Sequence, residues 1–235
     1  MATARLDLAA IERSLRAVQR DFARINIQLK VRRDPMGEEI VGRMLAGYEL
    51  VDGYLAKGVD LFGYGNSKLW LELNTMVLCG SDEGRRRDVA AHIAATERRF
   101  YDEHGGGIGA LVDWHARHRR ESPWLKAAGV YVRVLSEPQL FIEGNHRTGA
   151  LIMSYLLARD GKPPFVLSID NAVAYFDPSS VIKHTRKTTF ALLVQIPRIK
   201  KTFAAFLKVQ SDRRLLLASA SKRQQALGAV REASP

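Results

Sequence analysis

The chain has 235 residues, enough for one large domain or two small ones, and 46% of them are apolar, which excludes wholesale disorder. Cys79 is the sole cysteine, so an intramolecular disulfide and a multi-cysteine metal site are excluded. The formal net charge is +11, and it is placed unevenly, because the chain from Lys183 onward carries twelve Lys or Arg against Asp212 and Glu232.

The first half of the chain shows apolar residues at helical spacing. Apolar residues recur every three or four positions over 5–30, which predicts a first long helix. Pro35 interrupts the pattern, and a second helix is predicted over 37–57, before the glycine-punctuated connector GVDLFGYGNSK. Further helices are predicted, in chain order, over 68–78, 85–103, 108–119 and 123–136.

The second half continues in the same way. A helix is predicted over 146–159, where Asp160-Gly161 ends it. The run PFVLS is the only strand-like stretch. Helices are then predicted over 171–176, 179–184 and 186–208, with a kink or boundary at Pro197, and a last, loosely held helix over 212–230. The sequence therefore predicts an all-α protein.

The N-terminal residues and the longest apolar runs bear on the cellular compartment in which we expect the protein. The N-terminal residues mix charge into every turn and contain no unbroken apolar core of secretory type. The longest apolar runs, ALIMSYLLA and FALLVQI, fall short of the roughly 20 residues that a membrane helix needs. We expect a cytoplasmic protein without a membrane span.

The run LFIEGNHRTGALIMSYLL, residues 140–157, places charged residues where a helix begins. A helix start leaves about four N–H groups unpaired and carries roughly half a positive charge, so it favours anions. Gly144 permits backbone angles that side chains forbid, and Asn145 can cap the helix. Arg147 offers a fork of donors suited to phosphate oxygens, and Glu143 is the hard oxygen ligand that Mg²⁺ prefers.

This pattern also has a purely structural interpretation. Gly144 would turn the chain, Asn145 would cap the helix, and Glu143 would pair with Arg147 on the surface. Such a surface pair contributes at most about 1 kcal/mol of stability. The spacing alone leaves both interpretations open.

The wider run from Gly109 to Phe165 resembles the core of the Fic (Fido) domain family, whose signature is HPFx(D/E)GNGRxxR between two helices. The string FxEGNxRTG is shared, and a pair of alanines precedes it in the preceding helix. The residues in register are Ala127, Ala128, Phe141, Glu143, Gly144, Asn145, Arg147, Thr148 and Gly149. The resemblance implies a Fido-like core over 61–208, an N-terminal helical extension over 1–60 packed on it, and a basic C-terminal helix or tail over 209–235.

The resemblance also implies a chemistry. Most members of the family transfer AMP from ATP to a hydroxyl side chain of a target protein. Carried over, Glu143 would hold Mg²⁺, and the nucleotide phosphates would be held by the string Gly144, Asn145, His146, Arg147, Thr148 and Gly149.

Three positions depart from the family signature. Its leading His, the base for the hydroxyl, is Gln139 here, and an amide cannot provide a base effect typically worth about 10²–10⁴-fold in rate. The second Gly is His146, and the last Arg is Ala150. His146 at a helix start, where the dipole favours a neutral ring, is the candidate substitute base.

Two functions of different class follow. One is a nucleotidyl- or phosphotransferase that uses Mg²⁺ and ATP to modify a protein hydroxyl. The other is a catalytically inactive binding or regulatory module that keeps the fold. Nucleic acid is not the expected partner, because the basic C-terminal third lacks an alternation of aromatic and basic residues. Enzyme status and oligomeric state stay open from the sequence.

Other candidates have structural interpretations. His115 and His118 are three apart on a predicted helix and could share a metal, but no third ligand has suitable spacing, which favours a solvated basic face. The run Arg85-Arg86-Arg87 is typical of a solvated helix start.

Overall fold

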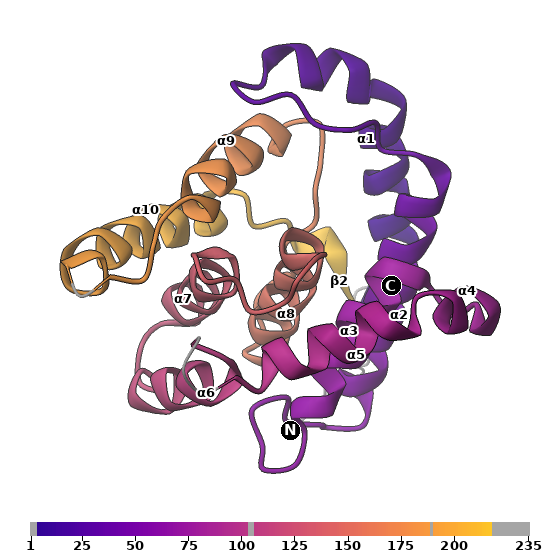
Figure 1. Ribbon diagram of the computed structural model, residues 1–235. Helices are drawn as coiled ribbons and strands as arrows, with labels where there is room; N and C mark the ends of the chain where they lie inside the picture. Colours follow the sequence, from indigo (N-terminus) through magenta and orange to yellow (C-terminus); the bar gives the residue numbers. More distant parts are fainter. Residues whose placement is uncertain (1–3, 103–105, 189, 218–235) are drawn as a thin grey trace, which may run out of the picture.

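The computed structural model describes residues 4–102, 106–188 and 190–217, and these residues are mostly helical, as the sequence predicted (Figure 1). The ten α-helices within the described ranges are α1 (Leu8–Gln28), α2 (Glu38–Ala56), α3 (Ser67–Cys79), α4 (Glu83–Asp88), α5 (Ala90–Phe100), α6 (Ile108–Arg117), α7 (Pro123–Leu135), α8 (Asn145–Arg159), α9 (Ala172–Lys183) and α10 (Ile196–Val209). Short elements complete them: β1 (Arg5–Leu6), the π-helical turn η1 (Ala191–Gln195), the 3-10 turn η2 (Arg213–Leu215) and β2 (Leu216–Leu217).

No helix in the described part of the chain is long and apolar enough to cross a membrane.

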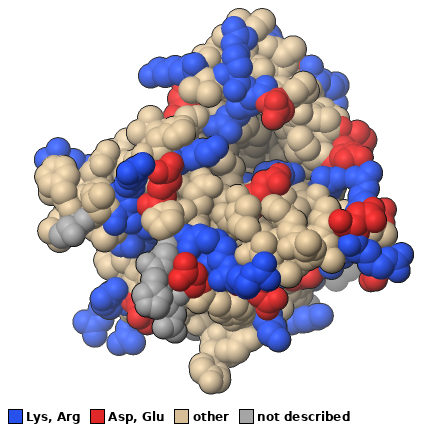
Figure 2. Space-filling model, viewed as in Figure 1, with Lys and Arg blue, Asp and Glu red and all other residues tan. Residues whose placement is uncertain are grey.

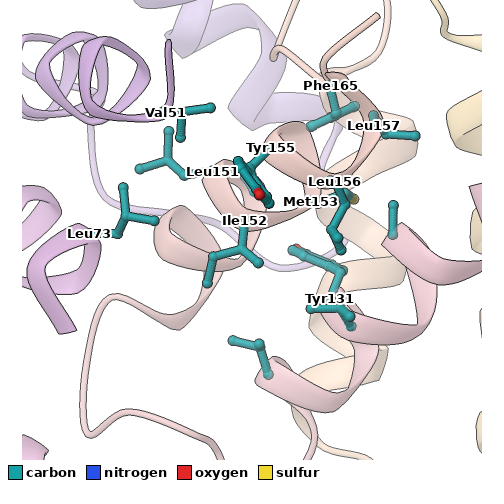
Figure 3. Close-up of a cluster of buried hydrophobic side chains, with 14 of the residues drawn as sticks. Val51, Leu73, Tyr131, Leu151, Ile152, Met153, Tyr155, Leu156, Leu157 and Phe165 are labelled. Atoms are coloured by element: carbon teal, nitrogen blue, oxygen red, sulfur yellow. The ribbon is translucent and has the colours of Figure 1, made fainter. Parts of the chain in front are cut away.

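Helix α8 lies at the centre of the molecule, with α7 on one side and α2 and α3 on the other (Figure 1). Every residue of α8 from Thr148 to Ala158 is buried, which is the pattern of an internal helix. Leu151, Ile152 and Met153 are each 0% exposed and stand in the main core cluster (Figure 3). Because its body is enclosed, the N-terminal end of α8 is held in a fixed position.

Helix α1 packs against α9. The Asp7 side chain caps α1 by accepting from the Ala10 N–H at 2.9 Å. Val18, Phe22 and Ile25 lie on one face of α1 and form a satellite cluster with Ala172 of α9. This contact fixes the chain that follows α1, residues 29–37, beside α9.

The two short strands correct the sequence prediction at both ends. β1 pairs antiparallel with β2, Arg5 opposite Leu217 and Leu6 opposite Leu216, so the first helix begins at Leu8, and residues 213–217 form a 3-10 turn followed by a strand in place of the expected α-helix. Buried Asp52 accepts from the Leu6 N–H at 2.8 Å, which anchors β1 outside the helix. Of the predicted basic tail over 209–235, residues 218–235 lie outside the described residues.

The strand-like run PFVLS, residues 164–168, forms neither a helix nor a strand and has no ladder partner among the described residues. Its carbonyl groups are instead satisfied by side chains. The Phe165 carbonyl accepts from Tyr48 at 2.8 Å and from Ser154 at 2.6 Å, and Asn171 donates to the Val166 carbonyl at 2.9 Å. Buried side-chain donors therefore replace a neighbouring strand.

Helix boundaries differ from prediction in three places. The helix expected over 85–103 is divided at Val89, where the backbone leaves helical angles (φ −107, ψ 17). Helix α9 runs through Pro178 without a break, because Ser179 and Ser180 donate their hydroxyls to the Tyr175 and Phe176 carbonyls and hold that turn. The helix expected from 186 begins later, with η1.

Candidate functional site

The turn before α8 depends on Gly144. This residue has φ 76 and ψ 5, in the left-handed region that favours glycine. A Cβ added there would lie 2.9 Å from Nδ2 of Asn74, on α3. Because the Asn74 amide lies this close to the turn, it donates hydrogen bonds to the Glu143 carbonyl at 2.9 Å and to the Thr148 hydroxyl at 3.0 Å. Asn74 therefore fastens the turn to α3.

The Asn145 side chain points into the protein. Its Oδ1 accepts from the Phe141 N–H at 2.9 Å, while its Nδ2 donates to the Phe141 carbonyl at 2.8 Å and to Oε1 of Gln139 at 3.2 Å. The residue is 4% exposed. The amide predicted as a phosphate ligand thus closes the loop from 139 to 145, and the first turn of α8 has no side-chain cap.

Glu143 and Arg147 lie together at the entrance of α8. Nη2 of Arg147 is 4.0 Å from Oε1 of Glu143, and Nη1 donates to the Val77 carbonyl at 2.6 Å. Burial lowers the pKa of Arg147, and the neighbouring carboxylate of Glu143 opposes that shift, so the guanidinium stays charged. The Glu143 side chain is 64% exposed, so its carboxylate is open to solvent and ligands.

His146 is held in an environment that keeps its ring neutral. Burial lowers its pKa to about 3, and the nearby charges of Arg33 and Lys183 lower it further. Its Nδ1 lies 3.4 Å from the Tyr131 hydroxyl, which in turn contacts the Tyr175 hydroxyl at 2.8 Å. A ring with this pKa takes up a proton poorly, which argues against His146 as a general base at neutral pH.

We expect His146 to make the protein less stable in acid. The pKa of His146 is about 3 in the fold against an ordinary 6.5, so between these pH values the unfolded chain binds a proton that the native state excludes. Stability is therefore lost as pH falls from about 6.5 toward about 3, by no more than about 1.4 kcal/mol per pH unit, less because the ring is partly exposed. Urea unfolding at pH 7.5 and pH 5 should show a smaller acid loss in His146→Gln than in the parent.

The control for this experiment is the variant His184→Gln, because the His184 side chain is exposed in the parent protein. This variant should lose as much stability in acid as the parent protein does. If His146→Gln and the parent lose the same amount, the buried ring does not couple folding to pH.

The remaining residues of the motif have structural contacts. The side-chain amide of Gln139 donates to the Leu135 carbonyl at 3.1 Å, and the backbone carbonyl of Gln139 accepts from Arg99 at 2.7 Å. Thr148 is 0% exposed, and Gly149 packs so closely on Tyr131 that an added Cβ would lie 3.0 Å from the ring. Gln139 lines the cavity described next, whereas Thr148 and Gly149 do not.

A cavity of about 560 Å³ opens at the start of α8, and Figure 2 shows a hollow in this face with Lys and Arg side chains along its margins. Gly144, Asn145 and His146 form one wall. An apolar wall is contributed by Leu15, Phe22, Met44, Phe165 and Phe176. The charged side chains on its lining are Arg32, Arg33, Arg147 and Lys183, with Asp34 and Glu143. Its volume lies in the range typical of small-molecule sites.

The sequence did not point to the cations that other segments bring to the cavity. Arg32 and Arg33 come from the segment between α1 and α2, and Lys183 comes from the end of α9. The only local signal was the charged run VRRDP before the second helix. Such a run is normally a solvated turn, and it becomes part of a site only because α1 packs beside α9.

The other sequence candidates do not form a site. The His115 ring stacks on Phe62 at 3.7 Å, and burial lowers its pKa to about 4, while His118 stacks on Trp114 at 4.3 Å. Arg85 pairs with Glu39, and Arg86 pairs with Glu72. Within the described ranges, no group of three His, Cys, Asp or Glu is placed to hold a metal ion.

Comparison of the chain with protein-family models, with curated proteins and with solved structures finds no match.

Proposed function

We propose that the cavity at the start of α8 binds a nucleotide through its phosphates, together with Mg²⁺. One observation carries this proposal: four cationic side chains and two carboxylates line a 560 Å³ cavity that also contains the start of α8. These six residues carry four positive and two negative charges, an excess of two positive charges, and the dipole of α8 adds positive potential at its N-terminal end. A small ligand with several negative charges fits that balance.

The residues have complementary roles in this proposal. Arg147 and the uncapped amides at the start of α8 contact phosphate oxygens. The apolar wall accommodates the base and ribose. Glu143 is the residue that would hold Mg²⁺, which would neutralise phosphate charge there. The donor set fits, because Mg²⁺ usually takes one or two carboxylates and completes its shell with phosphate and water.

Binding without rapid transfer is the function that the site supports best. Gln139 has no usable proton affinity, and the pKa of His146, lowered by burial to about 3, makes that ring a weak base at neutral pH. We therefore favour a binding or regulatory module over an AMP transferase. A labelled-ATP assay should detect no transfer to protein hydroxyls above the level of a His146→Ala variant. Transfer that depends on His146 would reverse this choice.

Titration calorimetry with ATP, with and without Mg²⁺, tests the nucleotide proposal. We expect Glu143→Ala to abolish the Mg²⁺ dependence of binding and to leave metal-free binding nearly unchanged. We expect Arg147→Met to weaken binding roughly 10- to 150-fold under both conditions, because a charged hydrogen bond contributes about 1.5–3 kcal/mol.

The matched control is the ion pair of Asp21 and Arg24 on α1, whose atoms are 2.9 Å apart and which does not line the cavity. Asp21→Ala and Arg24→Met should bind ATP as the parent does. The proposal fails if the parent protein binds no ATP, or if the two cavity variants behave like the two controls.

A further inference from the structure

Arg33 is held in the cavity wall by its own backbone. Asn26, near the end of α1, donates from Nδ2 to the Arg33 carbonyl at 2.9 Å, and its Oδ1 accepts from the Arg33 N–H at 2.9 Å. These two bonds fix the direction in which the Arg33 side chain leaves the segment. An arginine on a free surface loop has no such support.

The Arg33 side chain reaches α9 but forms no ion pair with the Asp177 carboxylate on that helix, which accepts from the Lys30 N–H instead. Its Nη2 donates to the Phe176 carbonyl at 3.3 Å and to the Ser180 hydroxyl at 3.0 Å, and its Cζ lies 4.6 Å from the centre of the Phe176 ring. Its Nε is buried and has no hydrogen-bond partner in the part of the chain that the structure describes. Among the ion pairs of the described residues, none involves Arg33.

Lys183 adds a second positive charge on the same side. The charges of both Arg33 and Lys183 act on His146, after burial, to lower its pKa, so both cations lie near that ring. Arg32 and His184 also line this side, and Asp34 and Glu143 are the carboxylates on the cavity lining. A buried N–H without a partner and a cation without a counterion are both costly, and a bound anion would relieve both.

We infer that Arg33, with Lys183, binds the end of a linear polyphosphate whose other end lies at Arg147 and the start of α8. This inference rests on the proposed function and names its ligand class: cations that three separate segments, α8, the α1–α2 connection and the end of α9, bring to one cavity favour a triphosphate over a monophosphate. The planar guanidinium provides the paired donors that phosphate oxygens accept. Asn26 is a positioning residue, because it acts only through the Arg33 backbone.

The test uses inorganic tripolyphosphate without metal, followed by ATP and AMP, on the full chain. Arg33→Met should weaken tripolyphosphate binding roughly 10- to 150-fold, which is the loss expected for one charged hydrogen bond. Arg33→Lys should recover only part of that loss, because lysine keeps the charge but not the paired donors, and Arg24→Met on the outer face of α1 should change nothing. The ratio of ATP to AMP affinity should fall in Arg33→Met, and Asn26→Ala should lower the same ratio.

Thermal melts of each variant establish that it is folded, and Arg33→Lys separates charge from packing on Phe176. Equal tripolyphosphate binding by Arg33→Met and the parent overturns the inference, as does failure of the parent to bind tripolyphosphate. If tripolyphosphate binds through Arg33 but ATP does not bind, the inference stands and the nucleotide proposal fails. If ATP binds through Glu143 and Arg147 with no effect of Arg33, the reverse holds.

Discussion

An Asn145→Leu variant is expected to lose about 3 kcal/mol of its free energy of unfolding, through buried groups left without hydrogen bonds. Asn145 is 4% exposed, and its amide pairs with both the N–H and the carbonyl of Phe141. Leucine has the same branched arrangement of side-chain heavy atoms but cannot pair with either group, so both would be buried and unsatisfied. Urea unfolding at neutral pH, with the slope of the transition compared between variant and parent, measures the loss.

Gln139→Leu is the matched control, since it removes an amide from the same loop. Gln139 is only partly buried, and the hydrogen bond that it shares with Asn145 is the longest of the three made by the Asn145 amide, at 3.2 Å. We expect a loss below about 1 kcal/mol. If Asn145→Leu instead keeps the parent's stability and loses ATP binding, then Asn145 acts on the ligand and not on the loop.

A Leu151→Ala variant is expected to lose about 3–5 kcal/mol, because it opens a cavity in the centre of the core. Leu151 is 0% exposed on α8 (Figure 3), and its side chain fills the space beside Gly47 on α2, where an added Cβ would lie only 2.4 Å from it. Leu193→Ala, at a side chain that is 73% exposed, should change stability by less than about 0.5 kcal/mol.

The same pair of variants also tests how the site is supported. Loss of Leu151 loosens the helix that presents Gly144 and Arg147, so ATP binding should weaken in Leu151→Ala at temperatures where the protein is still folded. If Leu151→Ala and Leu193→Ala unfold at the same temperature, α8 is not the main support of the fold.

Local signals in the sequence predicted where most helices lie. Asp160-Gly161 and the Gly144 turn bracket α8, and the predicted range 146–159 differs from Asn145–Arg159 by one residue. Ser122-Pro123 in the same way marks the start of α7, where the Ser122 hydroxyl accepts from the Leu125 N–H. These features depend on backbone angles and caps within a few residues, which a sequence states directly.

The parts that sequence could not predict depend on contacts between distant segments. Asn74 reaches the Gly144 turn from α3, and Arg33 reaches the cavity from the segment before α2. Neither contact can be predicted from local spacing, because the charged run VRRDP at Arg33 is also typical of a solvated turn. The run PFVLS shows the same dependence: its composition is strand-like, but only the tertiary fold decides whether another strand or the side chains of Tyr48 and Ser154 meet the Phe165 carbonyl.

The pairing of β1 with β2 bears on how the protein is made. β1 closes against residues at the far end of the described chain, and α1 packs on α9. During synthesis, α2 can therefore cover part of α1 early, whereas β1 stays unpaired until Leu216 and Leu217 have left the ribosome. The Arg33 side of the cavity is completed only once α9 has emerged, so a product truncated before α9 carries the motif at α8 without the contributions of Phe176 and Lys183.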